Sequence, residues 1–371
     1  MIVIIGGGIL GASTAYHLAK KGEKVTLIDR KDDGQATEAA AGIVCPWLSQ
    51  RRNKAWYRLV KGGARYYPEL VKALEADGQT DTGYRQVGTL SLHTDQDKLQ
   101  KVAERARKRR EDAPEIGEIE ILTSEETRER FPLVNEAYGS VFVSGGARVN
   151  GKKMRDALLQ AARGHGAIIK MGDARFSVEN GAVQGVSVKG DFNPTDKVID
   201  TSGAWSKQLI QPLDVNFEVS SQRAQLLQLQ LPDEVNSEGW PVIMPPNNSY
   251  VLSLAHGKII VGATRTDTEE FDYRATAGAI HEILGKAIEV APSLENSQLI
   301  ETRVGFRPYT PGFLPVIGRL PGYENVYVAN GLGASGLTSG PYLGAELARF
   351  VASEETELDF KDYDVNSAIP E

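Results

Sequence analysis

The residues that most clearly predict chemistry in this 371-residue chain are glycines near its start. An apolar run, residues 2–5, leads into Gly6, Gly8 and Gly11, spaced as GxGxxG, and residues 12–20 follow with apolar side chains at helical spacing. Between a strand and a helix, such glycines allow a tight turn, a close approach of the backbone to a pyrophosphate and close packing of helix on strand. The start of the helix offers its N–H groups and its positive dipole end to phosphates. The pattern therefore predicts a dinucleotide site, and the alternative is a glycine-rich turn with no ligand.

A carboxylate stands where such a site needs a ribose ligand. Residues 24–28 have the composition of a second strand, and this strand ends at Asp29. That aspartate lies about 20 residues after the glycines, the position from which nucleotide-binding folds bond a ribose hydroxyl. We expect Asp29 and the adjacent Arg30 to contact the nucleotide.

Composition excludes several other classes of protein. The formal net charge of −7 argues against a nucleic-acid partner, because nucleic-acid-binding proteins carry clustered positive charge. The five histidines lack metal-ligand spacing, so we predict no metal site. No apolar run approaches the roughly 18 residues of a membrane span, and no basic-then-apolar leader precedes the first strand. With a single cysteine, Cys45, the chain has no internal disulfide, and we expect a cytoplasmic protein.

The alternation of elements predicts an α/β fold with two interleaved domains. A Rossmann-type nucleotide domain would hold another buried strand at 197–206, which runs into small residues and would meet the cofactor, and a final helix at 341–351, after a glycine-rich run. Strands at 167–170 and 183–188 would flank a hairpin turn at Asn180-Gly181. Alternation between 217 and 265 predicts an antiparallel sheet for a substrate-binding domain. The predicted boundaries are 1–84, 140–214 and 302–371 for the nucleotide domain, and 85–139 and 215–301 for the inserted domain.

Three further motifs follow the glycine turn in order. They are Thr37-Glu38-Ala39-Ala40-Ala41-Gly42-Ile43, the segment 305–311 with its extension to 318, and the glycine-rich run 331–340. Together with the first motif they resemble the FAD-dependent D-amino-acid oxidase (DAO) family, and most closely its glycine oxidase and sarcosine oxidase-like branch. The resemblance covers essentially the whole chain and implies FAD as the cofactor. It also implies non-covalent attachment, because the cysteine that sarcosine oxidases use in the C-terminal half has no counterpart here.

The resemblance assigns flavin contacts to small residues. Residues 37–43 would line the ring, Ala174 would hold the adenine through its backbone, and free amides at 333 and 335–337 would stabilise negative charge on the reduced flavin. The alternative for the first segment is a tightly packed alanine helix. The full predicted set of cofactor contacts is Gly6, Gly8, Ile9, Leu10, Gly11, Asp29, Arg30, Thr37, Ala41, Gly42, Ile43, Ala174, Gly333, Ala334, Ser335, Gly336, Leu337 and Thr338.

The family's substrate residues map onto two positions, and a third departs from the pattern. Arg307 would clamp the substrate carboxylate with two parallel hydrogen bonds, and Tyr250 would bond the same group. A structural ion pair and a core tyrosine are the respective alternatives. Arg265 stands where glycine oxidase carries an apolar residue, so it either favours a substrate with a second acidic group or points to solvent. Phe313 also departs from the family pattern, which puts glycine itself in doubt as the substrate.

Two features near the ring-lining segment have open roles. Cys45 either lies close to the flavin or is buried as a small apolar side chain. Arg51 and Arg52 either guide an anionic substrate or belong to a solvated loop.

The implied activity is oxidative deamination of a small amino acid or secondary amine, of the glycine, D-amino-acid or sarcosine type. Hydride would pass to flavin N5, and dioxygen would reoxidise the flavin to give hydrogen peroxide. The alternative is a dehydrogenase that passes electrons to a quinone or a partner protein. A nicotinamide enzyme and a non-catalytic FAD-binding module are further alternatives. The sequence leaves open the amine, its stereochemistry and whether the chain forms a homo-oligomer.

Overall fold

The nucleotide-binding part of the molecule is built on a six-stranded sheet. The computed structural model describes residues 1–232 and 235–370. The strand order is β20-β21-β13-β1-β2-β9, in which only β20 is antiparallel to its neighbour. The central strands are buried apolar runs, as expected where helices or other layers cover both faces of a parallel sheet. The strands are β1 (Ile2–Ile5), β2 (Val25–Asp29), β9 (Ile168–Met171), β13 (Lys197–Asp200), β20 (Val316–Arg319) and β21 (Val326–Asn330).

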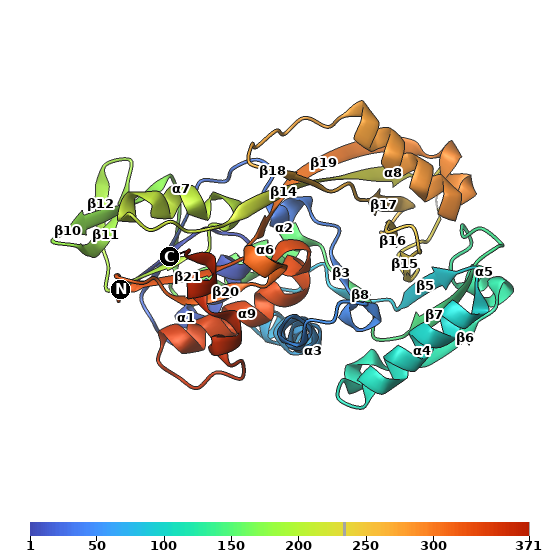
Figure 1. Ribbon diagram of the computed structural model, residues 1–371, viewed down its shortest axis with the longest axis horizontal. Helices are drawn as coiled ribbons and strands as arrows, with labels where there is room; N and C mark the ends of the chain where they lie inside the picture. The colour runs from blue at the N-terminus through green and yellow to red at the C-terminus, as the bar shows by residue number, and fades with distance from the viewer. Residues whose placement is uncertain (233–234, 371) are drawn as a thin grey trace.

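Four helices form a closely packed layer on this sheet (Figure 1). Helix α1 packs against α6 and α9, and α3 packs against α9. Small residues allow these contacts, since a Cβ on Gly344 of α9 would lie 2.5 Å from the Ser13 side chain, and one on Gly63 of α3 would lie 2.2 Å from the Thr338 carbonyl oxygen. The helices are α1 (Ile9–Lys20), α3 (Lys54–Ala76), α6 (Gly151–Gly164) and α9 (Gly336–Val351).

The last helix begins earlier than predicted. The sequence prediction placed its start at Pro341, whereas α9 starts at Gly336 and holds this proline in its interior. A proline there has no N–H for the carbonyl of Leu337, four residues before it. The Tyr67 hydroxyl on α3 donates to that carbonyl instead. A tertiary hydrogen bond therefore replaces the missing helical one.

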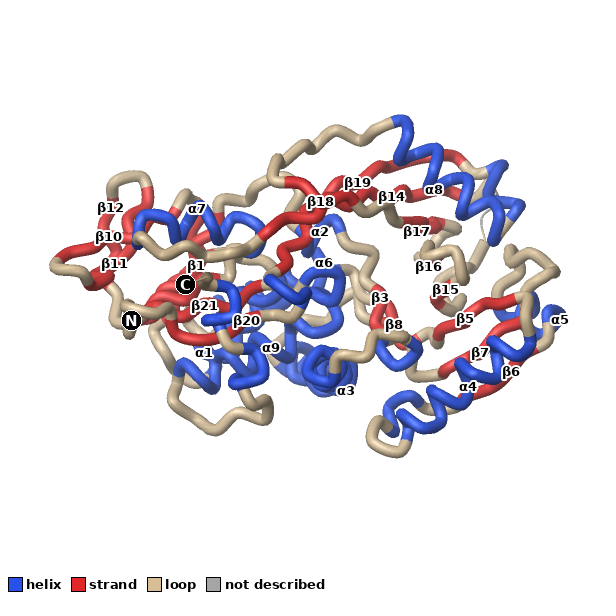
Figure 2. The backbone as a smooth tube through the Cα atoms, viewed as in Figure 1, coloured by secondary structure: helices blue, strands red, loops and turns tan. Residues whose placement is uncertain are grey.

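The second sheet has nine strands, in the order β18-β14-β17-β16-β15-β5-β7-β6 with β19 paired to the free side of β14. The strands between 217 and 265 pair antiparallel, as predicted, whereas β15 and β5 are parallel, so the sheet as a whole is mixed. Helix α8 (Ala277–Val290) packs on β14 and β17, while α4 (Gln96–Arg110) and α5 (Ser124–Arg130) cover the β5–β7 end (Figure 2). The strands are β5 (Thr89–His93), β6 (Ile119–Leu122), β7 (Gly139–Val143), β14 (Ser220–Gln230), β15 (Val242–Met244), β16 (Tyr250–Ser253), β17 (Lys258–Gly262), β18 (Thr266–Thr268) and β19 (Gln298–Tyr309).

The pairing of two strands differs from the predicted division of the chain. Strand β7 pairs with β5 and β6, and β19 pairs with β14, so both belong to the second sheet. The domain boundaries predicted at residues 140 and 302 had assigned most residues of β7 and of β19 to the nucleotide domain.

The hairpin at Asn180-Gly181 is present but joins different strands. Asn180 and Gly181 have φ of 51° and 75°, as a two-residue hairpin turn requires. They connect β10 (Ala174–Glu179) to β11 (Ala182–Val188), and β12 (Asp191–Pro194) completes a small sheet. The predicted partner, around residues 167–170, is β9, which pairs in parallel with β2.

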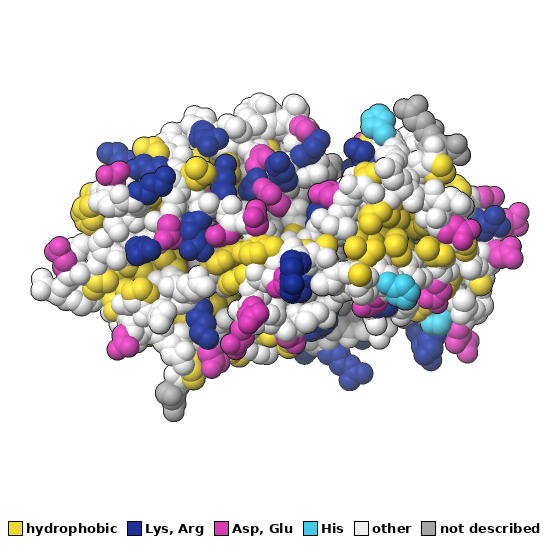
Figure 3. Space-filling view, turned by 90° about the horizontal axis from the view of Figure 1, so that it is seen from above, with side chains coloured by type: hydrophobic (Ala, Val, Ile, Leu, Met, Phe, Trp, Pro, Cys, Tyr) yellow, Lys and Arg dark blue, Asp and Glu magenta, His cyan; other side chains and the backbone are white. Residues whose placement is uncertain are grey.

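Shorter elements connect the two sheets. Strands β3 (Ile43–Val44), β4 (Arg85–Gln86) and β8 (Ala147–Arg148) form a third small sheet, and α2 (Ala36–Ala39) and α7 (Ser206–Ile210) are short helices. On the face drawn in Figure 3, lysine and arginine side chains are interspersed with acidic ones. None of the helices in the described part of the chain has the length and apolar character needed to cross a membrane.

Candidate functional site

A cavity of about 1040 Å³ is lined by residues of both large sheets. On one side lie the carboxyl ends of β1, β2 and β13, the edge at which open α/β sheets bind their ligands. On the other side lie residues of β14, β16 and β19, and the segment before α9 completes the wall. Of the predicted cofactor residues, all line this cavity except Gly11, Ser335 and Thr338.

The glycine turn brings backbone segments closer than side chains would allow. Gly6 has φ of +101°, and a Cβ on it would lie 2.5 Å from the Thr201 carbonyl oxygen. A Cβ on Gly11 would lie 1.9 Å from the carbonyl oxygen of Gly6. The hydroxyl of Thr201 donates to the carbonyls of Ile5 and Gly6, at 3.0 and 2.9 Å. Gly11 therefore acts by holding α1 against β1, and it does not face the cavity.

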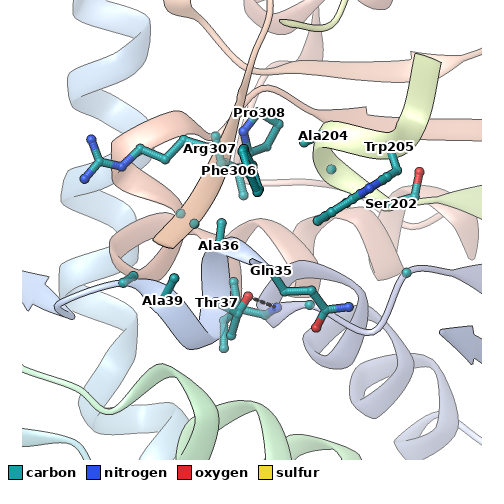
Figure 4. A pocket seen from close by; sticks show the side chains of 18 of the residues that line it. Gln35, Ala36, Thr37, Ala39, Ser202, Ala204, Trp205, Phe306, Arg307 and Pro308 are labelled. Atoms are coloured by element: carbon teal, nitrogen blue, oxygen red, sulfur yellow. Dashed lines mark hydrogen bonds between the residues drawn. The ribbon is translucent and has the colours of Figure 1, made fainter. Parts of the chain in front are cut away.

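The N-terminus of α1 has no side-chain cap from Gly8. The Ile9 N–H instead donates to the Thr37 hydroxyl at 2.9 Å, the dashed line in Figure 4. This contact fixes the start of α2 over the glycine turn. The Thr37 hydroxyl keeps a proton that it can donate to a bound ligand.

Asp29 is held in place by its neighbours and retains capacity to accept hydrogen bonds. Its carboxylate accepts from the backbone N–H groups of Gly7 and Lys31 and from the Gln35 side chain at 2.9 Å. A carboxylate has about four lone-pair positions, so a ribose hydroxyl can still donate to it. Arg30 pairs with Asp32 at 2.9 Å and Asp173 at 3.1 Å at the same end of the cavity.

Small residues give the opposite end a closely packed wall. Gly42 has φ of +87°, and its absent side chain leaves room for the Val149 carbonyl oxygen, 1.8 Å from the position of a Cβ. The Val149 N–H donates back to the Gly42 carbonyl at 2.8 Å. The segment is a four-residue helix followed by extended backbone, so the alternative of a regular alanine helix across 37–43 does not hold.

The glycine-rich run before α9 contributes backbone to the same end. Gly333, Ala334, Gly336 and Leu337 line the cavity. The expectation of a free amide at Ser335 was wrong, because its N–H donates to the Leu332 carbonyl at 3.0 Å. Its hydroxyl accepts from the Trp56 indole at 3.0 Å.

Thr338 has a structural contact. Its hydroxyl donates to the Ile43 carbonyl at 3.0 Å and ties α9 to the wall formed by residues 37–43. Thr338 and Ser335 therefore support the cavity from behind.

Arg307 lies on β19, opposite Gln222 of β14. Figure 4 shows its side chain leaving the strand on the side away from the Trp205 ring. Among the residues that the structure describes, none forms a hydrogen bond or ion pair with its guanidinium. Burial, together with repulsion from Arg265, holds its pKa below the usual value, while Tyr250 acts in the opposite direction. The alternative of a structural ion pair is thus not observed.

Tyr250 lies beside Arg307 in the cavity wall. Its ring covers Gly262 on β17, where a Cβ would lie 2.4 Å from the tyrosine hydroxyl. Burial raises the pKa of Tyr250 to about 12, against an opposing effect of Arg307 and Arg303. The hydroxyl therefore stays protonated at neutral pH and can donate a hydrogen bond.

Arg265 is exposed yet lines the cavity, and its guanidinium lies 5.7 Å from the centre of the Phe313 ring. It also lines a smaller adjoining cavity with Arg307 and Arg51. Arg52 lines neither cavity.

Two contributors were not predicted individually as site residues, although Trp205 lies in the segment 197–206 that we expected to meet the cofactor. The Gln35 side chain orients Asp29, and Trp205 lines the cavity while its ring stacks on Phe271 at 5.0 Å. Neither belongs to a recognisable motif. Gln35 lies between β2 and α2, and Trp205 follows β13. Their positions after strands of the nucleotide sheet are the only sequence signal for a role at the site.

Cys45 lines neither cavity. It is buried in the main apolar core, and this burial raises the pKa of its thiol to about 12. The interpretation as a small apolar side chain is therefore the one that the structure favours. Within residues 1–232 and 235–370, no cluster of histidine, cysteine and acidic residues could hold a metal ion.

Comparison with known proteins identifies the type of enzyme. Residues 1–350 match the model of the family described as DAO, FAD dependent oxidoreductase. The chain belongs to this family. It is an FAD-dependent oxidoreductase.

Individual relatives cover nearly the whole chain. The uncharacterized oxidoreductase YurR of Bacillus subtilis (strain 168) is 55% identical over 368 residues, which are 99% of each chain. Glycine oxidase of Pseudomonas putida (strain KT2440) is 27% identical over 350 residues, covering 92% of this chain and 91% of the relative. The crystal structure of iminodiacetate oxidase from Chelativorans sp. BNC1 is 39% identical, with a TM-score of 0.94 over 98% of both chains.

The cavity of this DAO-family member fits the requirements of FAD. The glycine turn and the start of α1 offer backbone N–H groups for a pyrophosphate, and Asp29 has capacity for a ribose. At the other end, Gly42 and the residues before α9 bring backbone to the wall without intervening side chains. We infer that these residues hold the cofactor, with its ring beside Arg307 and Tyr250.

Gly11→Ala tests the inferred role of the glycine turn. The new methyl group would lie 1.9 Å from the Gly6 carbonyl oxygen, so α1 must move away from β1. Overpacking of this kind costs about 1–3 kcal/mol, and we expect a lower melting temperature together with loss of bound flavin. The measurements are thermal unfolding and the flavin content of purified protein.

Gly164→Ala is the matched control, because nothing lies within 4 Å of the position of its Cβ. This variant should keep the flavin content of the parent. If Gly11→Ala also kept it, the close contact would not be required for cofactor binding.

Proposed function

We propose that this enzyme oxidises an amine whose nitrogen-bearing carbon also carries a carboxylate, and that it uses dioxygen as the electron acceptor. The observation that carries the proposal is the unpaired guanidinium of Arg307 beside the Tyr250 hydroxyl, in a cavity that fits FAD. The names of its relatives, glycine oxidase and iminodiacetate oxidase, agree with an amine that carries a carboxylate.

Arg307 and Tyr250 together supply what a carboxylate needs. A guanidinium offers two parallel N–H donors, and the tyrosine adds a third, neutral donor. Because the site is partly buried, these hydrogen bonds face little competition from water. Holding the carboxylate fixes the neighbouring Cα–H bond in one orientation. This positioning is the main contribution of these two side chains to the reaction.

FAD, when bound, would supply the two-electron acceptor for the hydride that leaves Cα. As the C–H bond breaks, the lone pair of the neutral amine forms a C=N bond. Water then adds to this imine and releases an amine or ammonia and a keto acid. An ammonium substrate must pass its extra proton to water before the hydride leaves, and the positive field of Arg307 favours that loss.

Hydride transfer from a neutral amine needs no side-chain base near the reacting carbon. The acidic residues that line the cavity are Asp29, Asp32 and Asp173 at the nucleotide end, together with Glu282. Glu282 forms an ion pair with Lys286 at 2.7 Å. This distribution supports hydride transfer over proton abstraction by a carboxylate.

Anaerobic reduction of the flavin tests both parts of the proposal. Glycine, sarcosine, D-alanine, D-proline, D-aspartate and iminodiacetate would be mixed with the holoenzyme under argon, and flavin absorbance would be followed. We expect at least one to bleach the flavin, and admitted air to restore the colour rapidly with formation of hydrogen peroxide. Bleaching by none of these amines would reject the proposed activity.

The same experiment separates the acceptors. If air restored the colour only slowly while a soluble quinone restored it fast, dioxygen would be the wrong acceptor. Amine oxidation itself would then still stand.

Arg307→Ala should raise the apparent substrate constant by about a hundredfold or more, from the loss of roughly 3 kcal/mol of charge-assisted hydrogen bonding. Arg307→Lys should recover only part of the loss, because an ammonium lacks the planar pair of donors. Steady-state kinetics on the best amine of the panel measures both.

The control is Arg319→Ala, which removes an exposed arginine on β20 that pairs with Glu324. It should leave the kinetics unchanged. Unaltered kinetics in Arg307→Ala would contradict the assignment of the carboxylate to this residue.

A further inference from the structure

The smaller cavity, of about 340 Å³, has an unusual set of charges. Arg51, Arg265 and Arg307 all line it, and none of the described residues that line it is an aspartate, glutamate or histidine. The remaining lining residues are glutamine, tyrosine, phenylalanine, serine, leucine, alanine and glycines, all uncharged. We call this space the arginine chamber.

The three guanidinium groups lack acidic partners within the described part of the chain. Arg51 donates to the carbonyl of Phe313 at 2.6 Å and lies 4.8 Å from the centre of the Trp56 ring. Arg265 contacts the ring of Phe313, and neither it nor Arg307 forms a hydrogen bond or ion pair with any of the described residues. Like charges in one partly buried space repel one another, and burial lowers the pKa of both Arg51 and Arg307. The described residues therefore provide no acidic partner for this charge.

A single turn positions two of the three arginines. Residues 311–313 form a short 3-10 turn in which Phe313 has φ of 56°, an uncommon conformation for a phenylalanine. The Phe313 N–H donates to the Thr310 carbonyl at 2.9 Å, and the Thr310 hydroxyl donates to the Leu314 carbonyl at 2.6 Å. The turn thereby presents the carbonyl of Phe313 to Arg51 and its ring to Arg265, with the ring stacked on Tyr309 at 4.9 Å.

The arginine chamber adjoins the inferred ring end of the larger cavity. Arg265, Arg307 and residues 331–334 line both spaces. A molecule whose carboxylate lies on Arg307 thus has the remaining two guanidinium groups within the same continuous region. A substrate with one carboxylate satisfies one arginine and leaves Arg51 and Arg265 without an anion.

We propose that the substrate carries a second carboxylate, which binds Arg265 and Arg51 while the first binds Arg307. The class of substrate is a dicarboxylic amine, such as an N-carboxyalkyl glycine. This inference rests on the proposed function and names the substrate class for the same site. At long range the net charge of −7 of the whole chain repels a dianion. Within the chamber the three arginines attract it.

Paired substrates isolate the contribution of the second carboxylate. Iminodiacetate and N-ethylglycine are both secondary amines of similar length, but only the first has two carboxylates. We expect the holoenzyme to show a kcat/KM at least about tenfold higher for iminodiacetate, the effect of one charge-assisted hydrogen bond or more. Equal values for the two amines would overturn the inference while leaving the proposed function intact.

Variants of the chamber locate the effect. Arg265→Gln and Arg51→Gln should each lower kcat/KM for iminodiacetate by about tenfold to a hundredfold, mainly by raising KM. The kcat/KM for N-ethylglycine should change by less than about twofold in both variants. Arg265→Lys should lie between Arg265→Gln and the parent. Arg52→Gln, next in the chain to Arg51 but outside both cavities, is the matched control and should change neither value. Equal losses on both amines would reject a specific role for these residues.

Binding of an inert analogue gives a readout that needs no turnover. Oxydiacetate has an ether oxygen in place of the amine, and methoxyacetate is its partner with one carboxylate. Titration of the holoenzyme, followed by flavin absorbance and by calorimetry, should give tighter binding of oxydiacetate, and Arg265→Gln should abolish the preference. If no amine bleached the flavin but this preference appeared, the proposed function would fail and the dicarboxylate site would stand. Without the preference, the inference falls whatever the activity.

Discussion

The arrangement of the site depends on one close contact between β19 and the segment 34–39. The Phe306 N–H donates to the Gly34 carbonyl at 3.0 Å, and a Cβ on Gly305 would lie 2.4 Å from the Cβ of Ala39. A Cβ on Gly34 would lie 2.7 Å from the Phe306 ring. Glycine at these positions lets a strand of the second sheet touch the segment that lines the nucleotide cavity. Because Arg307 is the next residue of β19, this contact sets the distance from the guanidinium to the inferred flavin wall.

Sequence could predict the parts of this arrangement that depend on local rules. The strand–glycine–helix order at Gly6 and Gly11, and the strand ending at Asp29, follow from backbone geometry within a few residues. The ordered set of motifs also gave the family and the cofactor, which the comparisons confirm. Arg307 and Tyr250 lie side by side in the cavity as the resemblance implied, although their roles remain predictions.

The remaining features depend on contacts between distant segments, which no local pattern encodes. The start of α9 was misplaced because Tyr67, 270 residues away, bonds the carbonyl that Pro341 leaves free. The sequence prediction paired β11 with β9, whereas β11 pairs with β10 and β9 pairs with β2. Strands β9 and β10 are separated by only two residues, and the composition of β9 suits either partner, so the sequence did not distinguish the two pairings. The arginine chamber likewise joins Arg51, Arg265 and Arg307 from three separate segments, so their shared space could not be read from the chain.

The burial of Cys45 has a consequence for the durability of the enzyme. Peroxide attacks the thiolate form of cysteine, and a thiol with a pKa of about 12 is almost entirely protonated in a neutral solution. Its side chain is also only 6% exposed, so solvent-borne oxidants reach it poorly. With dioxygen as acceptor, each turnover would release an oxidant into a cavity that Cys45, the only cysteine of the chain, does not line. The packing around this residue would then protect the catalyst from self-inactivation by its own product.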